Sequence, residues 1–208
     1  MNLKLSLATI LTATTLWFSS PAQAQPTRSI ASGVTTVRLN TNFLGALRDE
    51  GIKARAFEES TTARNSILFP INEGILDLAN ARGEIIHAGG IRLVSSSVNV
   101  RLVNPKIDTT ITPVLLALVV VNDQVIARLP IFDVKFSDLS TPLKPKKGTL
   151  RFKNATLTLR PEGAEALNAV FDTDSFSAGQ PFGTATVNAI LGRSKVARIK
   201  VSSQGAEE

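Results

Sequence analysis

The segment VLLALVVV, from Val114 to Val121, is eight residues long and contains no charge. It is rich in β-branched residues and is bounded by Pro113 on one side and Asn122-Asp123 on the other. A membrane-spanning helix needs about 20 apolar residues, so this segment is too short to cross a bilayer. We predict a central β-strand that is buried on both faces. Asn122-Asp123 tolerates positive φ and predicts a hairpin into Gln124–Leu129.

The segments around it predict an all-β domain. Val98, Val100 and Leu102 alternate with Asn99 and Arg101, which is the period of a half-buried strand. Further strands are expected at Gly33–Leu39, Ile52–Phe57, Ile67–Ile71, Gly74–Leu78, Glu84–Ile86, Ile91–Val94 and Ile131–Phe136.

Two short helices complete the expected fold. Asn42 is expected to cap a helix over Phe43–Glu50, with Gly51 just beyond its end, and Pro161 begins another over Pro161–Val170. The sequence therefore predicts a single domain, an antiparallel β-sandwich-like fold with its core at about residues 33–201.

An internal repeat links the two ends of this domain. Thr36-Val37-Arg38-Leu39 is followed by Ala46-Leu47, and Thr156-Leu157-Thr158-Leu159 is followed by Ala166-Leu167. The spacing from the first threonine to the last leucine is the same in both copies. Each copy is expected to form a strand, a short turn and a short helix.

The N-terminus has the three parts of a secretory signal peptide. A short start with one positive charge, Met1–Lys4, precedes the apolar run Leu5–Phe18 and the cleavage-like sequence Ala22-Gln23-Ala24. We predict a signal peptide at residues 1–24 and a mature domain at 25–208, exported to the periplasm, the cell surface or the medium. The mature chain is expected to have no transmembrane segment. The alternative is an uncleaved N-terminal anchor.

Composition excludes several chemistries. The chain has no cysteine, no tyrosine and one histidine. It therefore has no disulfides, no thiolate metal site, no cysteine nucleophile and no site that needs two histidines from one chain. Nucleophile-elbow and glycine-rich nucleotide motifs do not occur. The spacing of Asp77, Asp108 and Asp133 does not predict two converging carboxylates, so we expect a binding protein rather than an enzyme.

The one histidine, His87, is the leading site candidate. It ends an expected strand and is followed by Gly89-Gly90, which allow backbone to approach or turn closely. We predict a ligand-binding role for His87, Gly89 and Gly90, in which His87 ligates haem or hydrogen-bonds a ligand. No metal site is predicted otherwise. The alternative is a structural histidine whose ring binds a loop carbonyl.

Positive charge gathers in two places. Lys144, Lys146 and Lys147 form a basic loop between expected strands, and Arg193, Lys195, Arg198 and Lys200 make the C-terminal segment basic. Such patches suit an anionic lipid or cell-envelope polymer. The alternative is a set of solvated lysines that protects a sheet edge. Aromatic residues are not interleaved with these charges, so nucleic acid is not an expected partner.

Several motifs, in order, resemble the HtaA-like, haem-transport-associated domain family, over about Val34–Val187. They are Phe69-Pro70-Ile71 with Gly74-Ile75-Leu76-Asp77, Gly83-x-Ile85-x-His87-x-Gly89-Gly90, Val100-x-Leu102-x-Asn104-Pro105-x-Ile107-Asp108, Leu129-Pro130-Ile131-Phe132-Asp133 and Gly163-Ala164-x-Ala166-Leu167-Asn168.

The resemblance implies a secreted or surface-attached bacterial β-domain, often linked to haem acquisition. In well-known members a tyrosine ligates the haem iron and a nearby histidine supports it. This chain has no tyrosine, so that ligand has no counterpart here. The sequence predicts an exported, non-catalytic binding module for haem or another hydrophobic ligand. A structural or adhesive cell-envelope protein without a small ligand is the alternative.

Overall fold

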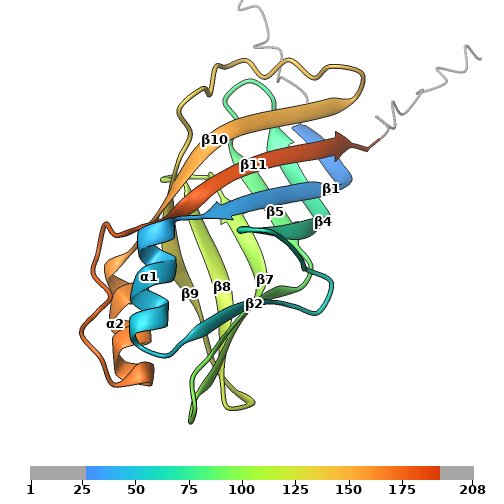
Figure 1. The fold of residues 1–208 in the computed structure, drawn as a ribbon. Coiled ribbons are helices and arrows are strands. Elements are labelled where there is room, and N and C mark those ends of the chain that lie inside the picture. The colour runs from blue at the N-terminus through green and yellow to red at the C-terminus, as the bar shows by residue number, and fades with distance from the viewer. Residues whose placement is uncertain (1–26, 193–208) are drawn as a thin grey trace, which may run out of the picture.

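A computed structural model describes residues 27–192, which form one antiparallel β-sheet with two helices at one end (Figure 1). The elements in chain order are β1 (Thr27–Leu39), α1 (Thr41–Asp49), β2 (Lys53–Phe57), β3 (Thr61–Ala63), β4 (Ser66–Asp77), β5 (Gly83–His87), β6 (Gly90–Val94), β7 (Asn99–Asp108), β8 (Val114–Val121), β9 (Gln124–Lys135), β10 (Thr149–Leu159), α2 (Pro161–Phe171) and β11 (Pro181–Leu191).

Strand β7 closes the sheet into a barrel. One of its edges pairs with β8, and its other edge pairs with β6 over Asn99–Val103 and with β5 over Lys106–Asp108. The closed ring has eight strands, in the order β1-β4-β5-β7-β8-β9-β10-β11, and β2, β6 and β3 extend it. The all-β prediction is confirmed, but the sandwich-like arrangement is corrected to a barrel. Alternating strands look the same in both architectures, and only the pairing of β7 with both neighbours distinguishes them.

The VLLALVVV segment is confirmed as strand β8, and its hairpin into β9 is also present. Its burial differs from the prediction. Ala117 and Val119 point into the barrel and are almost fully buried. Val120, on the other face, is also buried, but Leu116 and Leu118 are only partly covered. A barrel wall has one inner face, so the outer face of β8 is not covered by a second layer of sheet.

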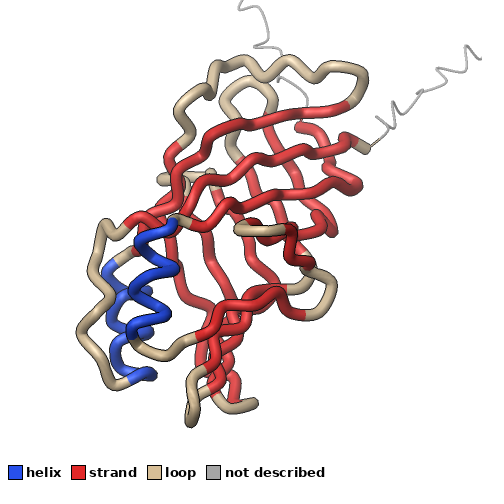
Figure 2. The backbone as a smooth tube through the Cα atoms, viewed as in Figure 1, coloured by secondary structure: helices blue, strands red, loops and turns tan. Residues whose placement is uncertain are grey.

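The two helices lie side by side at one end of the barrel (Figures 1 and 2). Strands β1 and β10 both pair antiparallel with β11, so they run parallel to each other and both end at the same rim. The expected strand–turn–helix repeat is therefore present in both copies, as β1–α1 and β10–α2. Helix α2 begins at Pro161, as predicted. Helix α1 begins earlier than predicted because Asn40, not Asn42, is its cap, and the Asn40 side-chain oxygen accepts from the amides of Asn42 and Phe43.

Phenylalanines fill the space between the helices and the barrel. The Phe43 ring of α1 lies 5.9 Å from that of Phe176 and 5.0 Å from that of Phe182, measured between centroids. The Phe132 ring of β9 stacks on Phe182 at 4.1 Å. This aromatic cluster joins the helical end to the larger of two hydrophobic clusters. The smaller cluster, around Ile71, occupies the opposite half of the barrel.

Two further predictions need adjustment. The predicted strands Ile67–Ile71 and Gly74–Leu78 form one strand, β4, which ends at Asp77 and carries an irregularity between Ile71 and Glu73 instead of a turn. The predicted signal peptide and the basic residues Arg193, Lys195, Arg198 and Lys200 lie outside the described residues.

The buried face of β8 gives a stability prediction. Val119→Asp places an unpaired carboxylate in the core, and we expect it to lower the free energy of unfolding by several kcal/mol, a large part of a small domain's stability. Urea denaturation of the purified protein measures the change. Val125→Asp is the matched control, because Val125 lies on the same hairpin and is 64 % exposed. An equally stable Val119→Asp protein would contradict the assignment of β8 to the core wall.

Candidate functional site

His87 lies at the end of β5 with its ring inside the barrel. The residue is 2 % exposed, although histidine is a polar side chain. Its neighbour in the pairing of β4 and β5 is Ile71, and the ring of Phe69 on β4 meets the imidazole edge-on, with 6.4 Å between centroids. The single histidine is therefore a core residue of the barrel wall.

Both ring nitrogens of His87 have hydrogen-bond partners. Nδ1 lies 2.9 Å from the carbonyl oxygen of Pro105 on β7, and Nε2 lies 2.7 Å from Oγ1 of Thr35 on β1. A carbonyl only accepts, so Nδ1 carries the proton and donates it to Pro105. In the neutral ring, Nε2 then accepts from the Thr35 hydroxyl. The ring thus ties β5 to β7 and, across the interior, to β1.

Burial also fixes the charge of the ring. Removal from water disfavours the imidazolium and lowers the pKa of His87 to about 4, although the hydrogen bond to the Pro105 carbonyl opposes this shift. At neutral pH the ring is uncharged. Its Nε2 lone pair is occupied by the threonine hydroxyl.

Gly89 and Gly90 mark the point where the chain passes from β5 to β6. Gly89 has φ of +73°, and a Cβ there would lie 2.8 Å from the carbonyl oxygen of Phe57. A Cβ on Gly90 would collide with the carbonyl oxygen of Leu102. The Gly90 amide donates to the hydroxyl of Ser60, at 3.0 Å. The two glycines therefore allow close backbone packing, and the residues that line the cavity near His87 do not include them.

Opposite these glycines, β7 carries an irregularity at Asn104-Pro105. Its pairing changes here from β6 to β5, and Asn104 adopts a positive φ of 47°. Proline has no amide hydrogen to give to a ladder, so it fits a position where pairing is interrupted. The Pro105 carbonyl is the acceptor that His87 satisfies.

A small cavity lies beside the imidazole inside the barrel. Its volume is about 30 Å³, which is room for no more than a few waters. Its walls are mainly apolar and include Phe69, Leu102 and Phe132, with Thr35 and His87 as the residues that carry polar side chains. The arrangement is an apolar lumen with one neutral hydrogen-bonding pair.

The carboxylates considered in the sequence do not converge on His87, and none of them lines this cavity. Asp77 accepts from the amide of Ala79 in a turn, and Asp133 pairs with Arg160 at the start of α2. Asp108 lies on the outer side of β7. The geometry places each of them in a local structural role.

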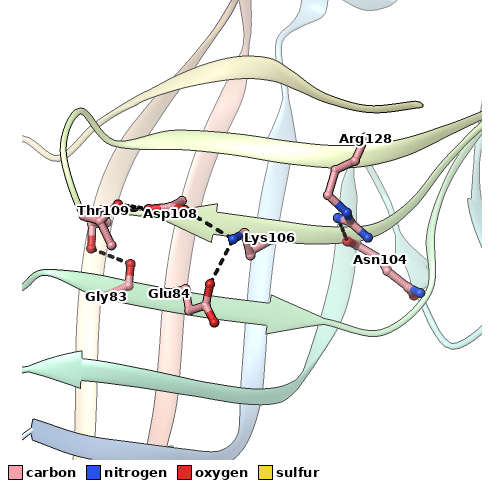
Figure 3. A network of polar contacts seen from close by, with 8 residues as sticks. Gly83, Glu84, Asn104, Lys106, Asp108, Thr109 and Arg128 are labelled. Carbon is pink, nitrogen blue, oxygen red and sulfur yellow. Dashed lines mark hydrogen bonds and ion pairs between the residues drawn. The ribbon is translucent and has the colours of Figure 1, made fainter. Parts of the chain in front are cut away.

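Figure 3 shows the outer side of the same β5–β7 seam. Lys106 lies between two carboxylates, 2.9 Å from Glu84 and 3.2 Å from Asp108. The hydrogen bond to Glu84, followed by that to Asp108, raises the pKa of Lys106, while hydrogen bonds from Thr110 contribute most to lowering the pKa of Asp108. The β5–β7 seam is therefore held by the ion pairs of Lys106 on its outer side and by the hydrogen bond from the neutral His87 to Pro105 on its inner side.

The basic loop is well separated from His87 in the chain and lies at the surface. Lys144, Lys146 and Lys147 are all exposed, and Lys146 forms a backbone bridge with Thr149 at the start of β10. None of the three has an ion pair within residues 27–192.

Sequence reasoning missed the three residues that hold the site together. Thr35, Ser60 and Pro105 bind His87 or Gly90 from positions far away in the chain. Pro105 belongs to one of the motifs quoted above, but only the barrel pairing brings its carbonyl to the imidazole.

Comparisons with known proteins agree on the architecture. No family model and no curated sequence matches the chain. Solved structures do match. The C-terminal domain of HtaA from Corynebacterium glutamicum superposes with a TM-score of 0.63 at 18% identity, covering 79% of this chain and 99% of that domain. The chain has the fold of an HtaA-like domain.

Two further structures from the same organism support this assignment. The N-terminal domain of HtaA gives a TM-score of 0.61 at 10% identity, covering 80% of this chain and all of that one. The heme binding protein HtaB gives 0.54 at 12% identity, covering 80% and 96%. The HtaA-like fold expected from the motifs is confirmed.

Two kinds of feature are absent from the described part of the chain. Among residues 27–192 no helix is both long and apolar enough to cross a membrane. In the same range, no group of three histidine or acidic side chains is arranged to hold a metal ion.

Haem does not fit the residues around His87 in the arrangement that the structure shows. The chain has no tyrosine, both ring nitrogens are engaged, and the cavity is far smaller than the roughly 300–1,000 Å³ of typical small-molecule pockets. A ligand of that size would enter only if the lumen widened.

The buried imidazole predicts a pH-dependent stability. Above pH 6.5, His87 is neutral in both folded and unfolded chains. As pH falls from 6.5 towards 4, the unfolded chain takes up a proton that the folded chain excludes, so the free energy of unfolding falls. We expect a loss of about 2 kcal/mol between pH 7.5 and pH 5.

Urea denaturation at the two pH values measures this loss, with His87→Gln as the variant that does not titrate at this position. The difference between the two proteins isolates the histidine from the carboxylates. An equal pH dependence in both proteins would contradict a neutral, buried His87.

Proposed function

We propose that this chain is an exported, non-catalytic binding module for a hydrophobic ligand, with haem as the first compound to test. The observation that supports the proposal most directly is the apolar lumen with its single polar pair, Thr35 and His87. Binding pockets are commonly apolar with a few placed polar groups that orient the ligand. The likeness in fold to the heme binding protein HtaB supports the choice of haem as a probe.

In this proposal His87 is the residue that a ligand meets on entering the lumen. Its Nε2 atom is an acceptor in the neutral ring, and only the Thr35 hydroxyl occupies it. A ligand that displaces this hydroxyl gains a nitrogen lone pair in an apolar setting. Gly89 and Gly90 contribute by allowing the close backbone packing that lets the chain pass from β5 to β6 beside the histidine. No catalytic group is required.

Hemin titration tests the proposal. If the lumen widens to admit haem, the wild-type protein gives a defined Soret shift and His87→Ala weakens it. Thr35→Val keeps the shape of the side chain but removes the hydroxyl, so it frees Nε2 and is expected to strengthen binding. Thr36→Val is the matched control, because Thr36 lies next along β1 and points to the other face.

The outcomes separate the parts of the proposal. An unchanged hemin spectrum in the wild-type protein would remove haem as the ligand. A shift that His87→Ala leaves intact would place the ligand elsewhere, away from the lumen.

One observation favours a second function. The three lysines of the basic loop are exposed and lack ion-pair partners in the described residues, which suits contact with an anionic envelope polymer or lipid. In this alternative the chain is a structural or adhesive envelope protein with no small ligand.

Cell fractionation tests this alternative. Replacing Lys144, Lys146 and Lys147 by glutamine removes three exposed charges, and we expect the protein to move from the envelope fraction to the soluble fraction. The same number of lysine-to-glutamine changes at Lys53, Lys135 and Lys153 serves as the control. Recovery of the wild-type protein in the soluble fraction at all salt concentrations would contradict envelope attachment.

A further inference from the structure

Three arginines lie in a row across neighbouring strands on the outer face of the sheet. Arg55 of β2 is paired with Arg92 of β6, and Arg92 is paired with Arg101 of β7. The residues on either side of each arginine, such as Leu93 and Leu102, point inward and are buried or partly buried, so the arginines point outward. Adjacent strands are about 4.8 Å apart. Like charges placed directly opposite each other destabilise a sheet, so this row opposes folding.

The row is only partly neutralised. Arg101 binds Asp123 at 2.7 Å, and its guanidinium carbon lies 5.3 Å from the centre of the Phe57 ring. Arg92 donates to the side-chain oxygen of Asn99, which carries no charge. Within residues 27–192, neither Arg55 nor Arg92 has a carboxylate within ion-pair distance. Both are exposed.

Lys106 differs from Arg55 and Arg92 in having carboxylates on both sides. Lys106 lies farther along the outer side of β7 and is held between Glu84 and Asp108 (Figure 3). Arg128 of β9, in the same view, donates to the carbonyl oxygen of Asn104, which carries no formal charge.

The same register line reaches exposed aliphatic side chains beyond the arginine row. It runs from Arg101 to Val120 of β8, which is 5 % exposed, and from there to Val125 of β9. Val125 is 64 % exposed and its neighbour Ile126 is 57 % exposed, at the start of β9 just after the β8–β9 turn. Arg101, the arginine nearest to these side chains, is ion-paired, so the uncompensated Arg55 and Arg92 lie at the far end of this line. The line is therefore cationic at one end and apolar at the other.

We infer that this face docks on the surface of an anionic phospholipid bilayer. Arginine pairs with phosphate oxygens through two parallel hydrogen bonds. Exposed valine and isoleucine insert at the boundary between headgroups and acyl chains, where apolar area adds to the attraction of basic residues for anionic lipid. A soluble polyanion would use the arginines but not the aliphatic pair, so the combination favours a bilayer. This inference does not depend on a ligand in the lumen.

Vesicle co-sedimentation of the purified protein tests it. Binding is expected to vesicles of phosphatidylcholine with added phosphatidylglycerol, and to fall sharply on phosphatidylcholine alone. Each basic residue at an anionic surface contributes roughly fivefold, so Arg55→Gln with Arg92→Gln is expected to lower the partition coefficient by about 30-fold. Val125→Ser with Ile126→Ser is also expected to lower it.

The matched control removes the same charge from two other exposed strand positions, with Lys135→Gln and Lys153→Gln. An equal loss in both double variants would overturn the inference, because it would show attraction by net charge alone. Loss only in a third variant, Lys144→Gln with Lys147→Gln, would assign the contact to the basic loop instead. Binding of soluble heparin with no binding to vesicles would also overturn it. Unchanged urea midpoints establish that each variant remains folded.

Discussion

The double-sided pairing of β7 is the constraint on which the barrel depends. Its Asn99–Val103 half binds β6, its Lys106–Asp108 half binds β5, and β8 binds the opposite edge along both halves. Without this strand the ring would open between β5 and β8. Because the pairing of β7 changes from β6 to β5, its ladder is interrupted at Asn104-Pro105. The chain passes from β5 to β6 opposite this point, at Gly89-Gly90. His87 donates to the carbonyl of Pro105 within this interruption.

A buried histidine suits this position because both of its ring nitrogens have hydrogen-bond partners and its ring is uncharged. An unpaired buried carbonyl or hydroxyl costs roughly 1–3 kcal/mol, and the imidazole satisfies one of each, on Pro105 and Thr35. The cavity beside it is lined from both hydrophobic clusters, with Leu102 from the larger and Ile107 from the smaller. The polar pair thus lies near the junction of the two halves of the core. A ligand in the lumen would compete with the contacts that join them.

The features predictable from sequence were those that depend on neighbouring residues. Alternation identified strands such as β7, and Pro161 identified the start of α2, because face selection and the first helical turn are local. The strand–turn–helix repeat could also be predicted, because its leucines face the core in both copies. Barrel closure could not be predicted from the sequence, because it depends on β7 pairing with β8 and β5 together. The hydrogen-bond partners of His87 could not be predicted for the same reason, since Thr35 lies 52 residues away in the chain.

The fold of this chain does not by itself identify a ligand. The barrel and its two helices match the HtaA domains over nearly their whole length, yet the chain has no tyrosine to supply an anionic iron ligand. What remains at the lumen is a neutral imidazole, a threonine hydroxyl and apolar walls. Apolar contacts discriminate weakly, since one methylene is worth only about 1–3 kcal/mol. Selectivity for any lumen ligand must therefore come from the shape of the widened cavity and from the single nitrogen lone pair of His87.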